Sequence, residues 1–391
     1  MAQRYKNMPD LYNITDSYFS NTRDCVEQDG DVNVTYAFFV RVPSMFAPRL
    51  MLNWLHEYAK QTNTRITLET EYKEGDLIPA GEPLFYITGS FLNLVECETL
   101  ILQRVGPPFI AALNAYYSCC ELPDTQFIAM GARHCAGWEM QEMMDYAASI
   151  GGRAAQKDTD AQGFINSANH ATAHFFGNEK GSGTMPHAMI GYYNSTLKAA
   201  KRYRAQHPDK PFIVLNDYFG KEIKDSLEVC RHFKKEAEEG ILSFRLDTNG
   251  ARYLEGLDYN TSIEVIRRNA PQTLKMHFSE RELKALYGQG VSAAAIWHFR
   301  NELDQAGFPN VKIVASSGFN FDKCRVMKLA RAPIDFVGTG SFLPTYWQDT
   351  YATADILKFG NNYRIKEGRA YLIDRYKQAL KEKKLRHIEI S

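Results

Sequence analysis

The chain of 391 residues carries 46 basic and 46 acidic side chains, so its formal net charge is zero and no global field attracts nucleic acid or an anionic membrane. Its hydrophobic share of 45% and charged share of 24% are typical of a folded globular protein and exclude a disordered chain. The seven cysteines form no CxxC pair, and no apolar run is long enough to span a bilayer. We therefore expect a cytoplasmic protein with reduced thiols and with neither a nucleic-acid nor a membrane partner.

The first part of the chain is rich in strand-like segments. Residues 34–42 read VTYAFFVRV, and residues 64–90 alternate short apolar runs with glycine, proline and aspartate turns. A helical pattern of apolar residues begins at Leu94. These patterns predict a strand-rich N-terminal α/β domain over residues 1–120.

From about residue 125 to residue 341 the sequence alternates short apolar strands with helical segments. This alternation indicates a parallel sheet with helical crossovers, and its repetition favours an irregular parallel α/β barrel over an open sheet. We place the barrel at residues 121–345 and a C-terminal extension at residues 346–391. The charged segment KQALKEKKLRH, residues 377–387, predicts a solvated helix.

The catalytic and binding residues of a parallel α/β barrel lie where the strands end and the loops begin. The segments SSGFN (316–320) and GTGS (338–341) place glycines there, and glycine lets successive backbone N–H groups approach an anion. They predict a phosphate site, with ordinary turn glycines as the alternative. Small residues, hydroxyls, carboxylates, arginines and a histidine at these strand ends indicate an anionic, hydroxyl-bearing ligand: Arg133, Ser167, Asn169, Thr184, His187, Asp217, Arg245, Asp247, Ser317, Gly318, Gly338 and Thr339.

The sequence leaves the chemical roles of three histidines open. On the residues alone, His187 in GTMPHA fits a core histidine, a metal ligand, a phosphate contact or a nucleophile. His170 and His174 in HATAH would lie one helical turn apart, but the motif lacks the glutamate of a zinc protease and shows no third ligand. We therefore predict no protein metal site and leave the role of this pair open.

Several motifs, taken in order, resemble those of the nicotinate phosphoribosyltransferase family. They run nearly end to end: TDSY (15–18), EGDLIPAGEPLFYITG (74–89), LNLVECETLILQRV (92–105), Gly131-x-Arg133, SAN (167–169), GTMPHA (183–188), RLDT (245–248), SSGFN (316–320) and GTG (338–340). The resemblance implies an N-terminal domain packed on an α/β barrel, with the C-terminal tail returning to the first domain. It also implies a homodimer with active sites at the subunit interface.

For function, the resemblance implies transfer of the phosphoribosyl group of 5-phosphoribosyl 1-pyrophosphate to nicotinate, giving nicotinate mononucleotide and pyrophosphate in NAD salvage. It implies Mg²⁺, bound mainly through substrate phosphates, and ATP as a co-substrate that transiently phosphorylates His187. Asp217 matches the carboxylate that orients this histidine.

The same resemblance implies roles for the remaining residues. Asp247 would lie beside the ribose and Arg245 would hold phosphate oxygens, while the loops at Ser317–Gly318 and Gly338–Thr339 would bind the 5′-phosphate. Tyr18, from the partner subunit, would stack on the pyridine ring. Arg133 would neutralise a carboxylate or a phosphate, and the other substrate-binding positions are Ser167, Asn169 and Thr184.

Two rival interpretations stay open. A decarboxylating quinolinate phosphoribosyltransferase would share the architecture, but it needs neither ATP nor a phosphorylated histidine and wants more cationic side chains. A non-catalytic barrel that binds a phosphorylated metabolite would need the glycine loops but not His187. Ala168, where nicotinamide enzymes carry an aspartate, argues against an amide substrate.

Overall fold

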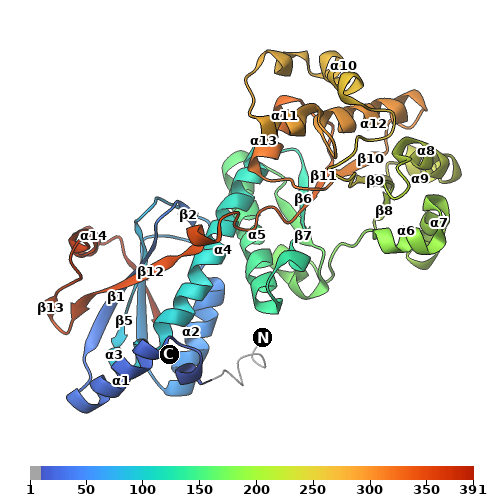
Figure 1. The fold of residues 1–391 in the computed structure, drawn as a ribbon. Helices are drawn as coiled ribbons and strands as arrows, with labels where there is room; N and C mark the ends of the chain where they lie inside the picture. Colours follow the sequence, from blue (N-terminus) through green and yellow to red (C-terminus); the bar gives the residue numbers. More distant parts are fainter. Residues whose placement is uncertain (1–9) are drawn as a thin grey trace. The chain divides into compact units, whose positions relative to one another are not determined.

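The computed structural model describes residues 10–391, which divide into two compact units (Figure 1). The first unit combines residues 10–113 with the C-terminal segment Leu343–Ser391, and the second unit is Asn114–Phe342. The C-terminal tail therefore belongs to the same unit as the N-terminal part, as predicted. No helix in the described part of the chain is long and apolar enough to cross a membrane.

The first unit is built on an antiparallel six-stranded sheet in the order β13-β12-β1-β5-β3-β14. Its strands are β1 (Asn33–Val40), β3 (Ile66–Thr70), β5 (Pro83–Ser90), β12 (Ala352–Phe359), β13 (Asn362–Tyr363) and β14 (Arg386–Ile390). A small second sheet pairs β2 (Ser44–Met45) with β4 (Leu77–Ile78). The helices are α1 (Ser17–Asp29), α2 (Arg49–Thr62), α3 (Phe91–Leu94) and α14 (Ala370–Lys381), and α4 (Cys97–Glu121) begins in this unit and ends in the second.

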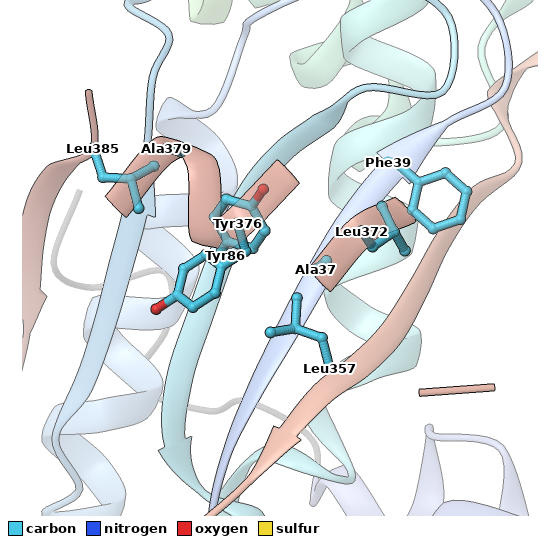
Figure 2. Packing of buried hydrophobic residues seen from close by; sticks show 8 residues of the cluster. All are labelled: Ala37, Phe39, Tyr86, Leu357, Leu372, Tyr376, Ala379 and Leu385. Atoms are coloured by element: carbon cyan, nitrogen blue, oxygen red, sulfur yellow. The ribbon is translucent and has the colours of Figure 1, made fainter. Parts of the chain in front are cut away.

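The apolar run of β1 is explained by burial of both faces of the strand. Ala37 and Phe39 pack against Leu372 and Tyr376 of α14 in the cluster that Figure 2 shows. Because side chains alternate along a strand, Phe38 points to the other face, where it stacks on Phe85 with ring centroids 4.9 Å apart. A strand buried on both sides needs no polar residue at alternate positions.

The C-terminal segment corrects one prediction. The solvated helix predicted over residues 377–387 ends at Lys381, and Arg386–Ile390 forms the strand β14, which pairs with β3. Helix α14 is also not fully solvated, because Leu372, Tyr376 and Ala379 are buried. These positions recur at the helical spacing of four and three residues, so they form an apolar stripe beneath the charged face.

The second unit contains six parallel strands in the order β7-β6-β11-β10-β9-β8. They are β6 (Gln126–Ala129), β7 (Phe164–Ser167), β8 (Phe212–Leu215), β9 (Leu242–Leu246), β10 (Lys312–Ala315) and β11 (Phe336–Thr339). The helices between them are α5 (Trp138–Thr159), α6 (His187–Tyr193), α7 (Thr196–Gln206), α8 (Glu222–His232), α9 (Lys234–Glu238), α10 (Tyr259–Asn269), α11 (Glu280–Tyr287), α12 (Ala293–Gln305) and α13 (Phe321–Leu329).

One irregular segment, residues 181–187, connects the two edges of this parallel sheet. Ser182 N–H donates to the carbonyl of Ser167 at the end of the edge strand β7, over 2.8 Å. Five residues later, His187 contacts Asp217, which follows the other edge strand, β8. The edge strands β7 and β8 are not paired with each other, so the barrel is irregular, as the sequence predicted.

Candidate active site

Every predicted site residue except Tyr18 lies in the second unit, and all of these but Thr184 and His187 lie at or just after the carboxyl ends of its strands. This placement follows from the parallel topology, because all six strands end at the same edge. Thr184 comes from the segment before α6, and His187 is the first residue of that helix. In sheet order, the strand-end residues are Ser167 and Asn169 (β7), Arg133 (β6), Gly338 and Thr339 (β11), Ser317 and Gly318 (β10), Arg245 and Asp247 (β9), and Asp217 (β8).

His187 and Asp217 form a direct pair. Nε2 of His187 lies 3.1 Å and 3.3 Å from the two carboxylate oxygens of Asp217. The carboxylate is buried, with 7% of its side chain exposed, whereas the imidazole is 46% exposed. With the Nε2 proton donated to Asp217, the Nδ1 atom keeps its lone pair, and it has no hydrogen-bond partner among residues 10–391. The pair therefore presents an oriented, accessible nucleophile.

An ion pair between the partly exposed Arg252 and the buried Glu222 fixes the loop that carries Asp217. The guanidinium of Arg252 donates to the backbone carbonyl of Asp217 over 2.9 Å and to Oε1 of Glu222 over 2.5 Å. Glu222 is fully buried, and its Oε1 also accepts a hydrogen bond from Thr248, the residue after Asp247. The ends of β8 and β9 are thus tied together. Neither Arg252 nor Glu222 was predicted, since no local pattern in a sequence pairs two charges 30 positions apart.

Arg245 is a buried cation whose donors the protein only partly satisfies. One terminal nitrogen donates to Oγ1 of Thr184 over 2.6 Å, and another lies 3.9 Å from Asp247. The buried Nε has no partner in the described chain. Burial lowers the pKa of the guanidinium, Asp247 and Asp217 oppose this shift, and Arg133 adds to it. The remaining donors are suited to an anionic ligand.

One oxygen of Asp247 accepts a hydrogen bond, and the other lies 3.9 Å from Arg245. Ser316 donates its hydroxyl to Oδ1 of Asp247 over 2.8 Å. The Asp247 side chain remains 20% exposed, so it is accessible from the carboxyl edge of the sheet. A fixed carboxylate at this place can stabilise positive charge that develops on a bound group.

The loops after β10 and β11 have different structural roles. Ser317 and Gly318 have positive φ values of 77° and 72°, which turn the backbone after β10. Thr339, by contrast, is buried and donates its hydroxyl to the carbonyl of Phe319 over 2.9 Å. A Cβ on Gly338 would lie 2.6 Å from the sulfur of Met130, so the glycine leaves room for this side chain. The open anion loop is therefore the one after β10, and the one after β11 supports it.

Ser167 lies beneath the site. Its fully buried hydroxyl donates to Asp145 over 2.8 Å and accepts from the backbone N–H of Asn169 over 3.0 Å. Burial raises the pKa of the Asp145 carboxyl, although its hydrogen bonds with Thr172 and Ser167 act in the opposite direction. Ser167 thus shapes the loop that presents Asn169, which is half-buried.

The histidines of HATAH do not share a face. Residues His170–Phe176 form a 3-10 helix, which has three residues per turn. Two residues four positions apart therefore point in directions that differ by about 120°. Nδ1 of His170 accepts the N–H of Gly181 over 3.1 Å, whereas Nδ1 of His174 lies 2.9 Å from the carbonyl of Ala171. The prediction that the pair lies one α-helical turn apart is therefore wrong. Residues 10–391 contain no group of three or more histidine, cysteine or carboxylate side chains that could hold a metal ion.

Tyr18 lies in the first unit, on helix α1. The residue is 59% exposed, and its hydroxyl donates to Asp16 over 3.2 Å. Asp16 also accepts a hydrogen bond from Thr99 over 2.8 Å. Burial and the nearby Asp16 raise the pKa of Tyr18. The TDSY motif therefore forms a compact local structure that leaves the aromatic ring open.

The fold is the α/β barrel with an added antiparallel domain that is found in solved phosphoribosyltransferases. A nicotinate-nucleotide pyrophosphorylase from Pyrococcus furiosus is similar with a TM-score of 0.68 and 19% identity, over 93% of this chain and 81% of that one. Human nicotinic acid phosphoribosyltransferase is similar with a TM-score of 0.56 and 13% identity, over 92% of this chain and 76% of that one.

Sequence comparison gives the particular resemblance. The chain is 25% identical over 274 residues to the nicotinate phosphoribosyltransferase of Bacillus subtilis (strain 168), a match that covers 70% of this chain and 45% of that protein. It thus spans less than half the length of this curated relative. No family model matches the chain. The similarity to nicotinate phosphoribosyltransferases that the motifs predicted is confirmed.

Proposed function

We propose that this chain is a nicotinate phosphoribosyltransferase of NAD salvage, which forms nicotinate mononucleotide and pyrophosphate with coupled hydrolysis of ATP. The observation that carries the proposal is the His187–Asp217 pair, with Nε2 and Oδ1 3.1 Å apart, at the edge that also carries Arg245, Asp247 and the Ser317–Gly318 loop. A phosphate-binding barrel without chemistry needs the loop, but it does not need an oriented nucleophile.

The coupling step is transfer of the γ-phosphoryl group of ATP to His187. Nδ1 of His187 attacks the γ-phosphorus, the bond from that phosphorus to the bridging oxygen breaks, and ADP leaves with the electron pair. Asp217 stabilises the positive charge that develops on the imidazole. Hydrolysis of the phosphohistidine then returns the free imidazole and releases inorganic phosphate.

In the transfer step, the pyridine nitrogen of nicotinate forms a bond to C1 of the ribose while the bond from C1 to pyrophosphate breaks. Asp247 is suited to stabilise the positive charge that develops on the sugar, and Arg245 to hold oxygens of the leaving pyrophosphate. Mg²⁺ would supply further neutralisation of the phosphates. The described residues offer no three-ligand cage, so it would be held through substrate oxygens and water.

We further propose a homodimer in which Tyr18 reaches the site of the partner subunit. Three exposed aromatic residues near the start of the C-terminal segment support an interface on the first unit: Tyr346 is 63% exposed, Trp347 is 51% and Tyr351 is 61%. Aromatic side chains are enriched at protein interfaces.

The proposal is tested by offering nicotinate, nicotinamide and quinolinate in turn with 5-phosphoribosyl 1-pyrophosphate and Mg²⁺, with and without ATP. We expect nicotinate mononucleotide from nicotinate alone, at a rate or yield that ATP raises. Release of CO₂ from quinolinate with no effect of ATP would favour the quinolinate enzyme instead. Binding of phosphorylated ligands with no product from any of the three bases would favour the non-catalytic barrel.

A further inference from the structure

Glu222 is a carboxylate at which the loops after β8 and β9 meet. It is the first residue of α8, the helix that follows the loop of Asp217, and its side chain is fully buried. Among residues 10–391, every donor that reaches its two oxygens comes from the loop after β9. Oε1 accepts from Arg252 over 2.5 Å and from Thr248 over 2.9 Å, and Oε2 accepts from the backbone N–H of Glu255 over 3.3 Å. The buried carboxylate therefore ties one loop to the other.

Arg252 extends this contact to the backbone of Asp217. The Nη2 atom that donates to Glu222 also donates to the carbonyl of Asp217 over 2.9 Å. The backbone of Arg252 is held separately, because its carbonyl accepts the N–H of Gly290 over 2.8 Å and its N–H donates to the carbonyl of Asn249 over 3.1 Å. With its backbone fixed, the guanidinium sets where the backbone of Asp217 lies, and so where its carboxylate lies.

Thr248 extends the contact to Asp247, the second carboxylate of the site. It directly follows Asp247 in the chain, it is fully buried, and its hydroxyl makes the bond to Glu222. Asp247 is also held at Oδ1 by Ser316, which belongs to the loop after β10. The position of Asp247 therefore depends on two contacts, one at its own carboxylate and one at the next residue.

The negative charge of Glu222 strengthens its hydrogen bonds. A hydrogen bond with an ionised partner is roughly twice as strong as a neutral one, and removal of one partner of a buried ion pair is costly. Glu255 adds a second connection, because its own Oε2 accepts the N–H groups of Ile223 over 2.7 Å and Lys224 over 3.0 Å at the start of α8. The two loops can shift relative to each other only if several of these bonds break.

We propose that Glu222 is a positioning residue shared by the two carboxylates of the site, Asp217 and Asp247. Through Arg252 it fixes the carboxylate that orients the imidazole, and through Thr248 it fixes the carboxylate beside the ribose. The assignment of these carboxylates to phosphoryl transfer and to phosphoribosyl transfer rests on the proposed function. Since one buried charge then supports both steps, its removal should impair both, whereas loss of one connection should impair one.

The test compares a variant that weakens both connections with a variant that removes one. Glu222→Gln keeps the shape but removes the charge. We expect single-turnover phosphorylation of His187 by labelled ATP and formation of nicotinate mononucleotide without ATP both to fall by about tenfold or more. Thr248→Val removes only the hydroxyl that bonds to Glu222, so it should lower the second rate by about tenfold and leave the first unchanged. Thr248→Ser keeps a hydroxyl and should keep the second rate.

A histidine NMR spectrum provides a measurement of positioning that needs no turnover. With ¹⁵N-labelled histidine and a neutral imidazole, the contact with Asp217 predicts a protonated Nε2 and an unprotonated Nδ1 for His187. The signals are assigned by their absence from His187→Ala. We expect Glu222→Gln to shift this pair of signals and Thr248→Val to leave it in place, because only the first variant acts on the backbone of Asp217.

A control variant and a melting curve keep the result interpretable. Glu238→Gln removes the exposed ion pair with Lys234 on α9, in which Nζ and Oε1 are 3.7 Å apart, and it should change neither the rates nor the spectrum. Thermal melting of each variant shows whether the fold is kept. If Glu222→Gln does not fold, the comparison of Thr248→Val with Thr248→Ser tests the proposal.

The outcomes separate this inference from the proposed function. Unchanged rates and an unchanged spectrum in a folded Glu222→Gln variant would overturn the positioning role. Equal loss of both steps in Thr248→Val would also overturn it, because the hydroxyl would then support the site as a whole. If the unmodified chain forms no nicotinate mononucleotide, the proposed function fails, and the histidine spectrum decides the role of Glu222: a shift in Glu222→Gln alone supports it, and no shift refutes it.

Discussion

At the residue scale, Asp217 combines burial with a hydrogen bond to the accessible imidazole of His187 at 3.1 Å. A buried acceptor of this kind selects the tautomer with the proton on Nε2, and in the proposed phosphoryl transfer it would stabilise the positive charge on the imidazole. The backbone of Asp217 is fixed in turn, since Arg252 donates to the Asp217 carbonyl over 2.9 Å. The orientation of the His187 imidazole thus depends on Asp217 and, behind it, on Arg252.

Asp217→Asn tests this dependence. The amide keeps the shape of the side chain but carries no charge. If its NH₂ group faces His187, it donates to Nε2 and places the imidazole proton on Nδ1. We expect phosphoryl transfer from ATP to fall by about 10²- to 10⁴-fold, the range for loss of an orienting carboxylate. Single-turnover transfer of labelled γ-phosphate measures it, with the exposed Asp209→Asn as control. Transfer at the unmodified rate would exclude the orienting role.

At the element scale, the segment 181–187 carries Thr184 and His187 across the edge of the sheet. It lies directly on the loop after β7, where a Cβ on Gly181 would be 2.6 Å from the carbonyl carbon of Asn169. A side chain at position 181 would therefore force the backbone of Asn169 or of the segment itself to shift, so the glycine sets the position of the segment.

Gly181→Ala should therefore displace the segment and lower ATP-coupled turnover by about tenfold or more, because a shift near 1 Å at reacting groups is costly. Gly183→Ala is the matched control, since a Cβ there meets nothing within 4 Å. Steady-state assays with melting curves compare the two. Equal activity of both variants would show that the contact at Asn169 does not position His187.

The first turn of α4 makes a separate prediction about stability. Burial, followed by the nearby Asp355 and Asp16, raises the pKa of Glu98 from 4.5 to about 8. The folded state therefore binds more protons than the unfolded state between these values, and the free energy of unfolding falls as the pH rises through them.

Glu98→Gln removes this titration, so it should flatten the pH dependence between pH 4.5 and 8 and stabilise the protein at the upper end. Denaturant unfolding at pH 5 and pH 8 measures the difference. Glu27→Gln, at an exposed position on α1, should leave the dependence unchanged. A Glu98→Gln variant that loses stability at pH 8 would contradict the claim that the buried, charged Glu98 destabilises the fold at this pH.

What the sequence reveals depends on the range of the interaction. The apolar run of β1 and the alternation of strands and helices are local patterns, so the sheet architecture and the strand-end residues were predictable. Strand β14 was not, because RHIEI alternates charge with little apolar content and its partner β3 lies more than 300 positions earlier. Likewise, the contacts of Glu222 with Arg252 and Thr248 exist only once the loops are folded.

At the scale of the whole molecule, the central prediction is that each active site needs two subunits. Tyr18 lies in the unit built from both ends of the chain, whereas His187 lies in the other. Tyr18→Ala and His187→Ala homodimers should each be severely impaired. If Tyr18 acts across the interface, an equal mixture that exchanges subunits should regain about a quarter of the unmodified activity, since half of the dimers then contain one intact site.

Sedimentation shows whether the dimer forms, and an assay before and after subunit exchange shows whether activity returns. A mixture that stays at the level of its two components, although heterodimers are present, would place Tyr18 and His187 in the same subunit or remove Tyr18 from the site.

The most direct test of the account is the fate of the γ-phosphate of ATP during turnover of nicotinate. We predict that labelled phosphate is found on His187 as an acid-labile phosphoramidate, that His187→Ala lacks the label, and that this variant forms nicotinate mononucleotide at a rate that ATP no longer changes. Product formation in which ATP still accelerates His187→Ala, or label on another residue, would contradict the assignment of His187 as the nucleophile.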